Sequence, residues 1–93
     1  MDASFSVVII AKSAFGALPA RYIWTRFCKR SINDQANLVR LSVTFHVPLH
    51  TQAYYTAVNN MIGKDYSTNQ IKGVLSELSL IKTLLLEADG FFR

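Results

Sequence analysis

Hydrophobic and polar positions alternate over residues 39–49, where every odd-numbered position is apolar and the positions between are mostly polar. A period of two is typical of a half-buried β-strand, and the β-branched residues in this run favour a pleated surface. We therefore expect a strand that ends at Pro48, which cannot donate a hydrogen bond within a sheet. A helix-turn-helix is the alternative, because several apolar residues also fit its core positions. These are Leu41, Phe45, Val47 and Ala53.

The chain before this run predicts a strand and then a helix. Residues 5–11 form a short β-branched run typical of a buried strand. A helix is expected over residues 19–30, because Pro19 suits a first helical turn and apolar residues gather on one side of the helical wheel. These residues are Ala20, Ile23, Trp24, Phe27 and Cys28. The polar residues 31–37 are then expected to form a connection.

Two helices are predicted after the alternating run. Helical spacing of apolar residues begins near residue 51, and Gly63 is expected to end the first helix. After a turn, Ser67 and Gln70 have the spacing of a capping box, so the second helix is expected to start there and to end at Gly90.

These elements give the order β-α-β-α-α. The expected fold is a small α+β domain, with a sheet of two or more strands covered by helices. The alternative is an all-α fold with a helix-turn-helix-like unit.

Composition indicates one small domain that associates with other chains. The 93 residues are 51% hydrophobic and only 17% charged, with a mean hydropathy of +0.21. This length supports a single core, so we expect one domain over residues 1–93. The low charge favours an apolar surface that meets another chain. We therefore expect a homo-oligomer or a subunit of a protein complex.

Charge and cysteine content bear on the compartment. The net charge is +4, and no acidic residue occurs between Asp2 and Asp34. Residues 1–33 therefore have a second interpretation, as a basic N-terminal extension or a targeting segment. The single cysteine, Cys28, fits a reducing intracellular compartment and a small buried side chain. The cytoplasm is favoured and the mitochondrion is the alternative. The apolar run near the N-terminus is too short to span a bilayer.

The sequence shows little sign of catalytic or metal chemistry. His46 and His50 are four positions apart, but Pro48 separates them and no further ligand is near. The acidic residues Glu87 and Asp89 are expected to face solvent at a helix end. The glycines match no phosphate-binding loop. We therefore predict no catalytic residue, no metal, no cofactor and no small-molecule substrate.

Basic residues of the first predicted helix are the clearest candidates for binding. Candidate contacts to nucleic acid or to an acidic partner are Arg21, Arg26, Lys29 and Arg30. Tyr22 and Trp24 lie among them, and aromatic side chains can stack on exposed bases. The alternative is an ordinary solvated helix face with Trp24 in the core. A helix-turn-helix would read bases with residues 49–62, which contain no lysine or arginine.

The last predicted helix carries a leucine-rich stripe with two interpretations. Its residues follow a spacing of three and four, which is typical both of a core face and of a helix-helix interface. The candidate association face comprises Ile71, Val74, Leu78, Ile81 and Leu85.

Two stretches resemble the small dimerising subunit of the KEOPS tRNA-modification complex. Residues 37–65, "NLVRLSVTFHVPLHTQAYYTAVNNMIGKD", resemble the first strand and helix of that family, and residues 73–91, "GVLSELSLIKTLLLEADGF", resemble its last helix. The family has a strand hairpin between these helices, whereas this chain has only a short segment. The resemblance implies dimerisation within an RNA-related complex.

Taken together, these patterns predict a non-catalytic small subunit or interaction module that acts by protein-protein association. The alternative is a nucleic-acid-binding protein of helix-turn-helix type.

Overall fold

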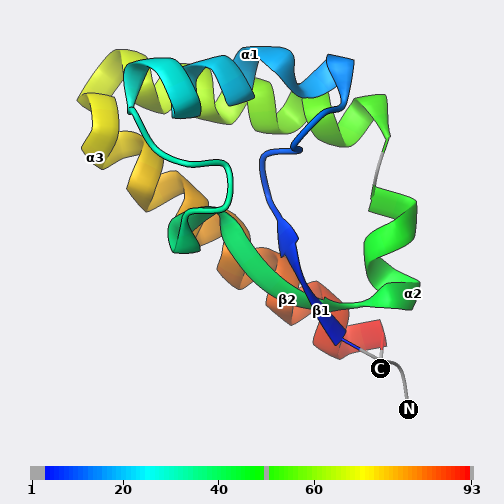
Figure 1. Cartoon of the computed structure of the whole chain (residues 1–93). Coiled ribbons are helices and arrows are strands. Elements are labelled where there is room, and N and C mark those ends of the chain that lie inside the picture. Colours follow the sequence, from blue (N-terminus) through cyan, green and yellow to red (C-terminus); the bar gives the residue numbers. More distant parts are fainter. Residues whose placement is uncertain (1–3, 50, 93) are drawn as a thin grey trace.

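The computed structural model describes residues 4–49 and 51–92 and has the predicted α+β architecture. Two antiparallel strands, β1 (Ser4–Val8) and β2 (Leu38–Ser42), lie beside the long helix α3 (Gln52–Phe92) (Figure 1). Helix α1 (Leu18–Tyr22) lies along the first half of α3. The shorter segments are η1 (Phe15–Ala17), the π-helical turn η2 (Ile23–Phe27), η3 (Gln35–Asn37), α2 (Val43–His46) and η4 (Val47–Leu49).

The strand register follows the predicted period of two. Val7 pairs with Val39, and Ser6 pairs with Arg40. Val39 and Leu41 are buried, whereas Arg40 between them is exposed, because successive side chains of a strand point to opposite faces. This half of the alternating run is therefore a strand, as predicted.

Asn37 ends the first strand earlier than predicted. β1 stops at Val8, because the next two residues bond to Asn37 instead of continuing a ladder. The N–H of Ile9 donates to the backbone oxygen of Asn37 at 2.8 Å, and the N–H of Ile10 donates to its Oδ1 at 2.7 Å. Asn37 is fully buried, so these bonds fix Ile9 and Ile10 in the core.

The second strand also ends early, and the prediction that it continues to Pro48 is wrong. It stops at Ser42, and α2 follows at once. The Oγ of Ser42 accepts a hydrogen bond from the N–H of Phe45 at 3.4 Å, which is the contact of a helix N-cap. The alternating run is therefore part strand and part helix.

The first predicted helix is split into α1 and η2. Pro19 lies in its first turn, as expected, and Trp24 is fully buried. The N–H of Cys28 donates to the oxygen of Ile23, five residues earlier, which defines the π turn. The helix ends with Lys29 at φ 55°, a left-handed conformation common just after a helix.

The two predicted C-terminal helices are the two arms of α3. A single residue, Gln70, breaks the helix, with φ 54° and ψ −134°. We call residues 52–69 the first arm and residues 71–92 the second arm; they diverge from this corner in Figure 1. The predicted stop at Gly63 and the capping box at Ser67 are wrong, since both residues lie inside the first arm. Helical structure also continues past Gly90 to Phe92.

Gly73 explains why the arms can meet so closely. A Cβ at this position would collide with the backbone oxygen of Asp65 and would lie 3.0 Å from the Cβ of Asn69. The corner is therefore built around the absence of a side chain at residue 73.

The core combines side chains from β2, from the two residues that follow β1, from α1 and η2, and from both arms of α3. Residues 4–33 belong to this fold through β1 and Trp24. The buried cluster comprises Ile9, Ile10, Ala20, Trp24, Cys28, Val39, Leu41, Val58, Ile62, Val74, Leu78 and Ile81.

Candidate interaction surface

The four predicted basic contacts have different roles. The guanidinium of Arg21 donates to the backbone oxygens of Ala11 at 3.1 Å and of Ala14 at 2.9 Å, so this side chain holds the loop before α1. Arg26 and Lys29 are exposed. Among the four predicted contacts, Arg26 and Lys29 are therefore the two that are exposed and hold no loop in place as Arg21 does.

Arg30 forms a partly exposed ion pair. Its Nη1 lies 3.4 Å from Oδ2 of Asp34. The pKa of Asp34 is lowered, first by a hydrogen bond from the N–H of Ala36 and further by Arg30. Such surface pairs contribute little to stability, so Arg30 can exchange Asp34 for another anion at small cost.

Three aromatic rings pack against one another, and one of them lies beside Arg26. The rings of Tyr22 and Phe27 meet edge to face with centroids 5.3 Å apart, and Phe27 stacks on Tyr66 at 5.5 Å. The guanidinium carbon of Arg26 lies 5.6 Å from the centroid of Tyr22. We call Tyr22, Arg26, Phe27 and Tyr66 the aromatic-arginine cluster. Tyr22 is 46% exposed and Phe27 is 49% exposed.

Two members of this cluster were not predicted as site residues. Phe27 was expected on the apolar side of a 3.6-residue helix, and this prediction is wrong because the wider π turn rotates it outward. Tyr66 was expected in a turn, but the first arm of α3 continues through it and carries its ring to Phe27. A long-range contact of this kind has no local sequence signal.

Trp24 belongs to the core and is unavailable for stacking on a ligand. It is fully buried, and its Nε1 donates to the oxygen of Ser31 at 2.8 Å. The second interpretation of the basic helix is therefore confirmed for this residue.

The predicted association face of the last helix is mostly used within the chain. Val74, Leu78 and Ile81 are buried in the core, and Leu85 is partly buried against it. Ile71 is 37% exposed at the corner. These residues therefore act chiefly as a core face, which is the first of the two interpretations. Different leucines of this arm are exposed, namely Leu80, Leu84 and Leu86.

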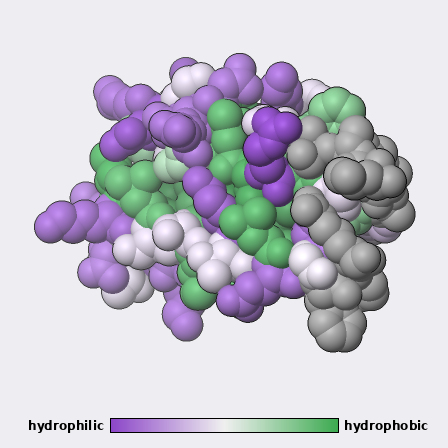
Figure 2. Space-filling model, turned by 90° about the horizontal axis from the view of Figure 1, so that it is seen from below, coloured by the Kyte–Doolittle hydropathy of each residue, from purple (hydrophilic) through white to green (hydrophobic). Residues whose placement is uncertain are grey.

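The second arm also contributes to an apolar part of the surface. Figure 2 views the molecule from below, the side along which this arm runs in Figure 1. Apolar side chains gather in the middle and on the left of the described part of this face, and hydrophilic ones lie among and around them. The exposed leucines fall on two flanks of the arm, because Leu84 and Leu86 are two positions apart on a helix.

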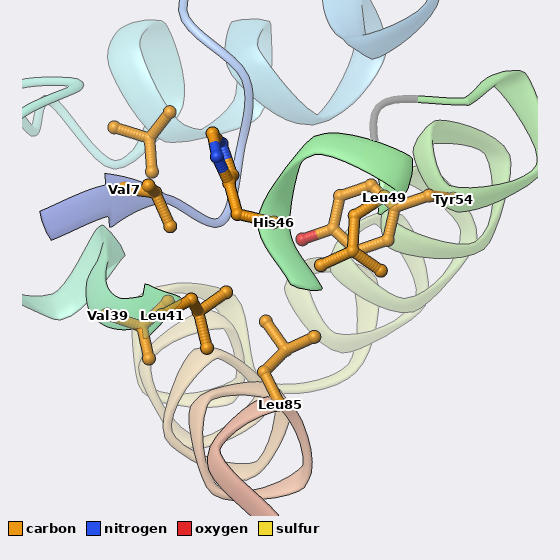
Figure 3. Close-up of a pocket in the computed structure, with 8 residues that line it drawn as sticks. Val7, Val39, Leu41, His46, Leu49, Tyr54 and Leu85 are labelled. Carbon is orange, nitrogen blue, oxygen red and sulfur yellow. The ribbon is translucent and has the colours of Figure 1, made fainter. Parts of the chain in front are cut away.

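One small cavity lies between the sheet and α3. Figure 3 shows labelled side chains around it from both strands, from α2 and η4, and from both arms of α3. The space inside it that is open to a water molecule is about 10 Å³, which is about the least that holds one water, so this space suits no larger ligand. His46 reaches its wall, and Tyr54 donates a hydrogen bond from its hydroxyl to the oxygen of Ile9 at 3.0 Å.

The structure describes most of the remaining ionisable side chains, within the ranges 4–49 and 51–92. No three histidine, cysteine, aspartate or glutamate side chains gather there as a metal site. His50 lies outside the described residues. Burial raises the pKa of the Cys28 thiol against the opposing effect of Arg30, which keeps it protonated and fits the predicted buried role. The expectation of a solvent-facing Asp89 is wrong, since this side chain is 2% exposed.

The corner of α3 brings two carboxylates together. Asp65 and Glu77 line an open hollow of about 380 Å³ that also contains Gly73. The pKa of Glu77 is raised, first by burial and then by the charge of Asp65. A hydrogen bond between the side chains of Glu77 and Asp65 also raises this pKa, whereas Lys64 lowers it. Once Glu77 is ionised, its charge opposes that of Asp65 across the corner.

None of the helices in the part of the chain that the structure describes is both long enough and apolar enough to cross a membrane. Comparisons with protein-family models, with curated proteins and with solved structures found no match to this chain. The resemblance to the KEOPS subunit therefore stays a prediction, and the function is argued from the surface itself.

Proposed function

We propose that this chain is a non-catalytic interaction module that acts by protein-protein association, with the aromatic-arginine cluster as its contact surface. The supporting observation is the stack of the half-exposed Phe27 on the partly buried Tyr66, extended by Tyr22 and Arg26. Tyrosine and arginine are enriched among the residues that contribute most to binding at protein interfaces, and aromatic rings supply large contact areas.

Exposure of these rings has a cost that a partner would remove. Phe27 has no polar atom in its side chain, yet about half of its surface faces water. Burying that surface releases free energy in proportion to the apolar area removed from water. The rings also restrain one another, so little side-chain entropy is lost when a partner binds.

The charge around the cluster favours an acidic partner. Arg26 and Lys29 are exposed, and Arg30 is only loosely held by Asp34. A basic rim attracts acidic groups and orients them before the apolar contacts form. The partner that fits is an acidic protein segment with aromatic or aliphatic side chains.

A second candidate function is binding of single-stranded RNA. The specific observation is the arginine beside an exposed tyrosine ring, because bases stack on aromatic rings and on guanidinium planes. This candidate would place the chain in an RNA-related complex, as the resemblance implies.

Fluorescence anisotropy with two labelled probes separates these candidates. One probe is an acidic peptide of alternating glutamate and leucine with a single tryptophan, and the other is oligouridylate. We expect the peptide to bind at low salt. Phe27→Ala should weaken this binding by about tenfold or more, because it removes the centre of the cluster. Phe15→Ala is the matched control, because Phe15 is 86% exposed in η1.

Three results contradict the protein-protein proposal. The first is no binding of the peptide even at low salt, and the second is equal binding of the peptide to the wild type and to Phe27→Ala. Binding of oligouridylate alone, with a steep salt dependence, would instead favour the RNA candidate.

A further inference from the structure

We propose that Gln70 is a hinge through which two copies of this chain exchange the second arms of α3, giving a domain-swapped dimer. When the second arm of one copy leaves its place in the core, the second arm of the other copy fills that place. The inference does not rest on the proposed function.

The hinge is a single residue in an unfavourable conformation. Gln70 has φ 54° and ψ −134°, which is the mirror image of the extended region. Glycine enters this region freely, but residues with a Cβ rarely do. Residues on both sides of Gln70 are helical. Glutamine is itself a good helix former, so its local preference opposes the break.

Rotation of Gln70 to helical angles would join the two arms into one helix. With 41 residues in α3, this helix would be about 60 Å long at 1.5 Å per residue. The joined helix relieves the backbone strain at Gln70. It also separates Asp65 from Glu77, whose carboxyl groups lie close enough at the closed corner for Asp65 to raise the pKa of Glu77.

A straight α3 cannot persist in an isolated copy. Val74, Leu78 and Ile81 of the second arm are buried against the rest of the chain, and straightening would expose them. A second copy offers an identical receiving surface of β2 and the first arm, so every core contact can form again between copies. The hydrogen bonds between Ser42 and Asp89 can form again in the same way.

The contacts at the corner decide the balance between the two forms. The close approach of Gly73 to Asp65 exists only in the closed form. The strain at Gln70 also exists only there. Removing that strain should therefore favour the monomer, whereas strengthening the helical preference should favour the dimer.

Two substitutions at the hinge test this balance. Gln70→Gly removes the strain, so its dimer association constant should fall by about tenfold or more relative to the wild type. Gln70→Ala keeps the strain and strengthens the helix, so its dimer fraction should rise. The measurement is size-exclusion chromatography with light scattering, from low micromolar to near-millimolar protein, with a reductant present to keep Cys28 reduced.

Isotope-filtered NMR distinguishes arm exchange from simple side-by-side contact. Leu41 of β2 and Leu85 of the second arm line the same cavity. In a dimer of differently labelled copies, we expect nuclear Overhauser effects between Leu41 of one copy and Leu85 of the other. The proposal is overturned if these effects are only intramolecular, if Gln70→Gly dimerises as strongly as the wild type, or if both the wild type and Gln70→Ala stay monomeric.

The outcome is independent of the aromatic-arginine cluster. All four of its residues precede Gln70 in the chain, so each copy keeps its cluster whether or not the arms exchange. Failure of arm exchange would leave peptide binding unchanged, and failure of peptide binding would leave the light-scattering result unchanged.

Discussion

The carboxylate of Asp89 accepts two hydrogen bonds from Ser42, one from its N–H at 3.1 Å and one from its hydroxyl at 2.6 Å. These residues are 47 positions apart and both are buried. Ser42 ends β2 and caps α2, while Asp89 lies near the end of α3. One pair of side chains therefore joins the last turns of α3 to the place where the alternating run changes from strand to helix.

We expect Asp89→Ala to lower the free energy of unfolding by about 3 kcal/mol, because it leaves the buried N–H and hydroxyl of Ser42 without their acceptor. Asp89→Asn keeps one acceptor oxygen and should cost less. Urea denaturation followed by circular dichroism measures both. Glu87→Ala is the control at an exposed position of the same helix, and its effect should stay within about 0.5 kcal/mol. Equal losses from Asp89→Ala and Glu87→Ala would contradict the role of this pair.

Two glycines of α3 should respond in opposite directions to the same substitution. Gly73→Ala should destabilise the protein by about 2 kcal/mol, because its Cβ meets the backbone of Asp65. Gly63→Ala should stabilise it by about 0.5–1 kcal/mol, because nothing lies within 4 Å of that Cβ and alanine favours a helix. Thermal unfolding at low micromolar concentration measures both, and a stabilising Gly73→Ala would rule out the close corner.

Tyr54 should make the protein sensitive to alkali. Burial raises the pKa of Tyr54 to about 12. In the unfolded chain this tyrosine ionises near pH 10, so the stability it contributes is complete below pH 10 and is lost as the pH rises toward 12. The stability difference between the wild type and Tyr54→Phe should therefore shrink by about 1 kcal/mol between pH 9 and 11. A difference that stays constant over this range would show that Tyr54 is not buried.

The carboxylates at the corner of α3 should respond to acid. The pKa of Glu77 is raised by burial and by Asp65, so its contribution to stability is complete below its unfolded pKa and is lost as the pH rises through its folded pKa. Glu77→Gln should therefore be more stable than the wild type at pH 7 and equal to it below pH 4. Adding Asp65→Asn to Glu77→Gln should give no further gain, because the same repulsion is already absent. Melting temperatures at the two pH values test both expectations, and a less stable Glu77→Gln at pH 7 would contradict them.

The sequence alone was sufficient to predict those helices and strands that local patterns determine. The alternation around Val39 and Leu41 identified a strand, Pro19 marked a helix start, and Trp24 was recognised as a core candidate. In each case the relevant preference lies within a few residues of the element itself.

The element boundaries depended on distant partners. β2 ends at Ser42, which donates hydrogen bonds to Asp89. β1 ends just before Ile9, whose N–H donates to the backbone oxygen of Asn37. The corner of α3 falls at Gln70 and not at Gly63, because a corner at Gln70 lets Gly73 pack against Asp65. These contacts join residues that no local window contains together.

In the candidate site too, some features can be predicted from the local sequence and others depend on distant contacts. The cationic character of Arg26 and Lys29 is visible in the sequence, but the surface beside them is not. Phe27 reaches it through the π turn, and Tyr66 reaches it through the fold of α3. A wheel of 3.6 residues per turn assigns Phe27 to the core, so the centre of the cluster could be found only in three dimensions.

The most direct test of the account is a chemical-shift map of the labelled protein titrated with the acidic peptide. We expect the largest changes in amide and aromatic signals on residues 22–30 and on Tyr66. These changes should disappear in Phe27→Ala, whereas Phe15→Ala should retain them. Changes centred on Leu80 and Leu84 of the second arm, or no changes at low salt, would contradict the claim that the aromatic-arginine cluster is the contact surface.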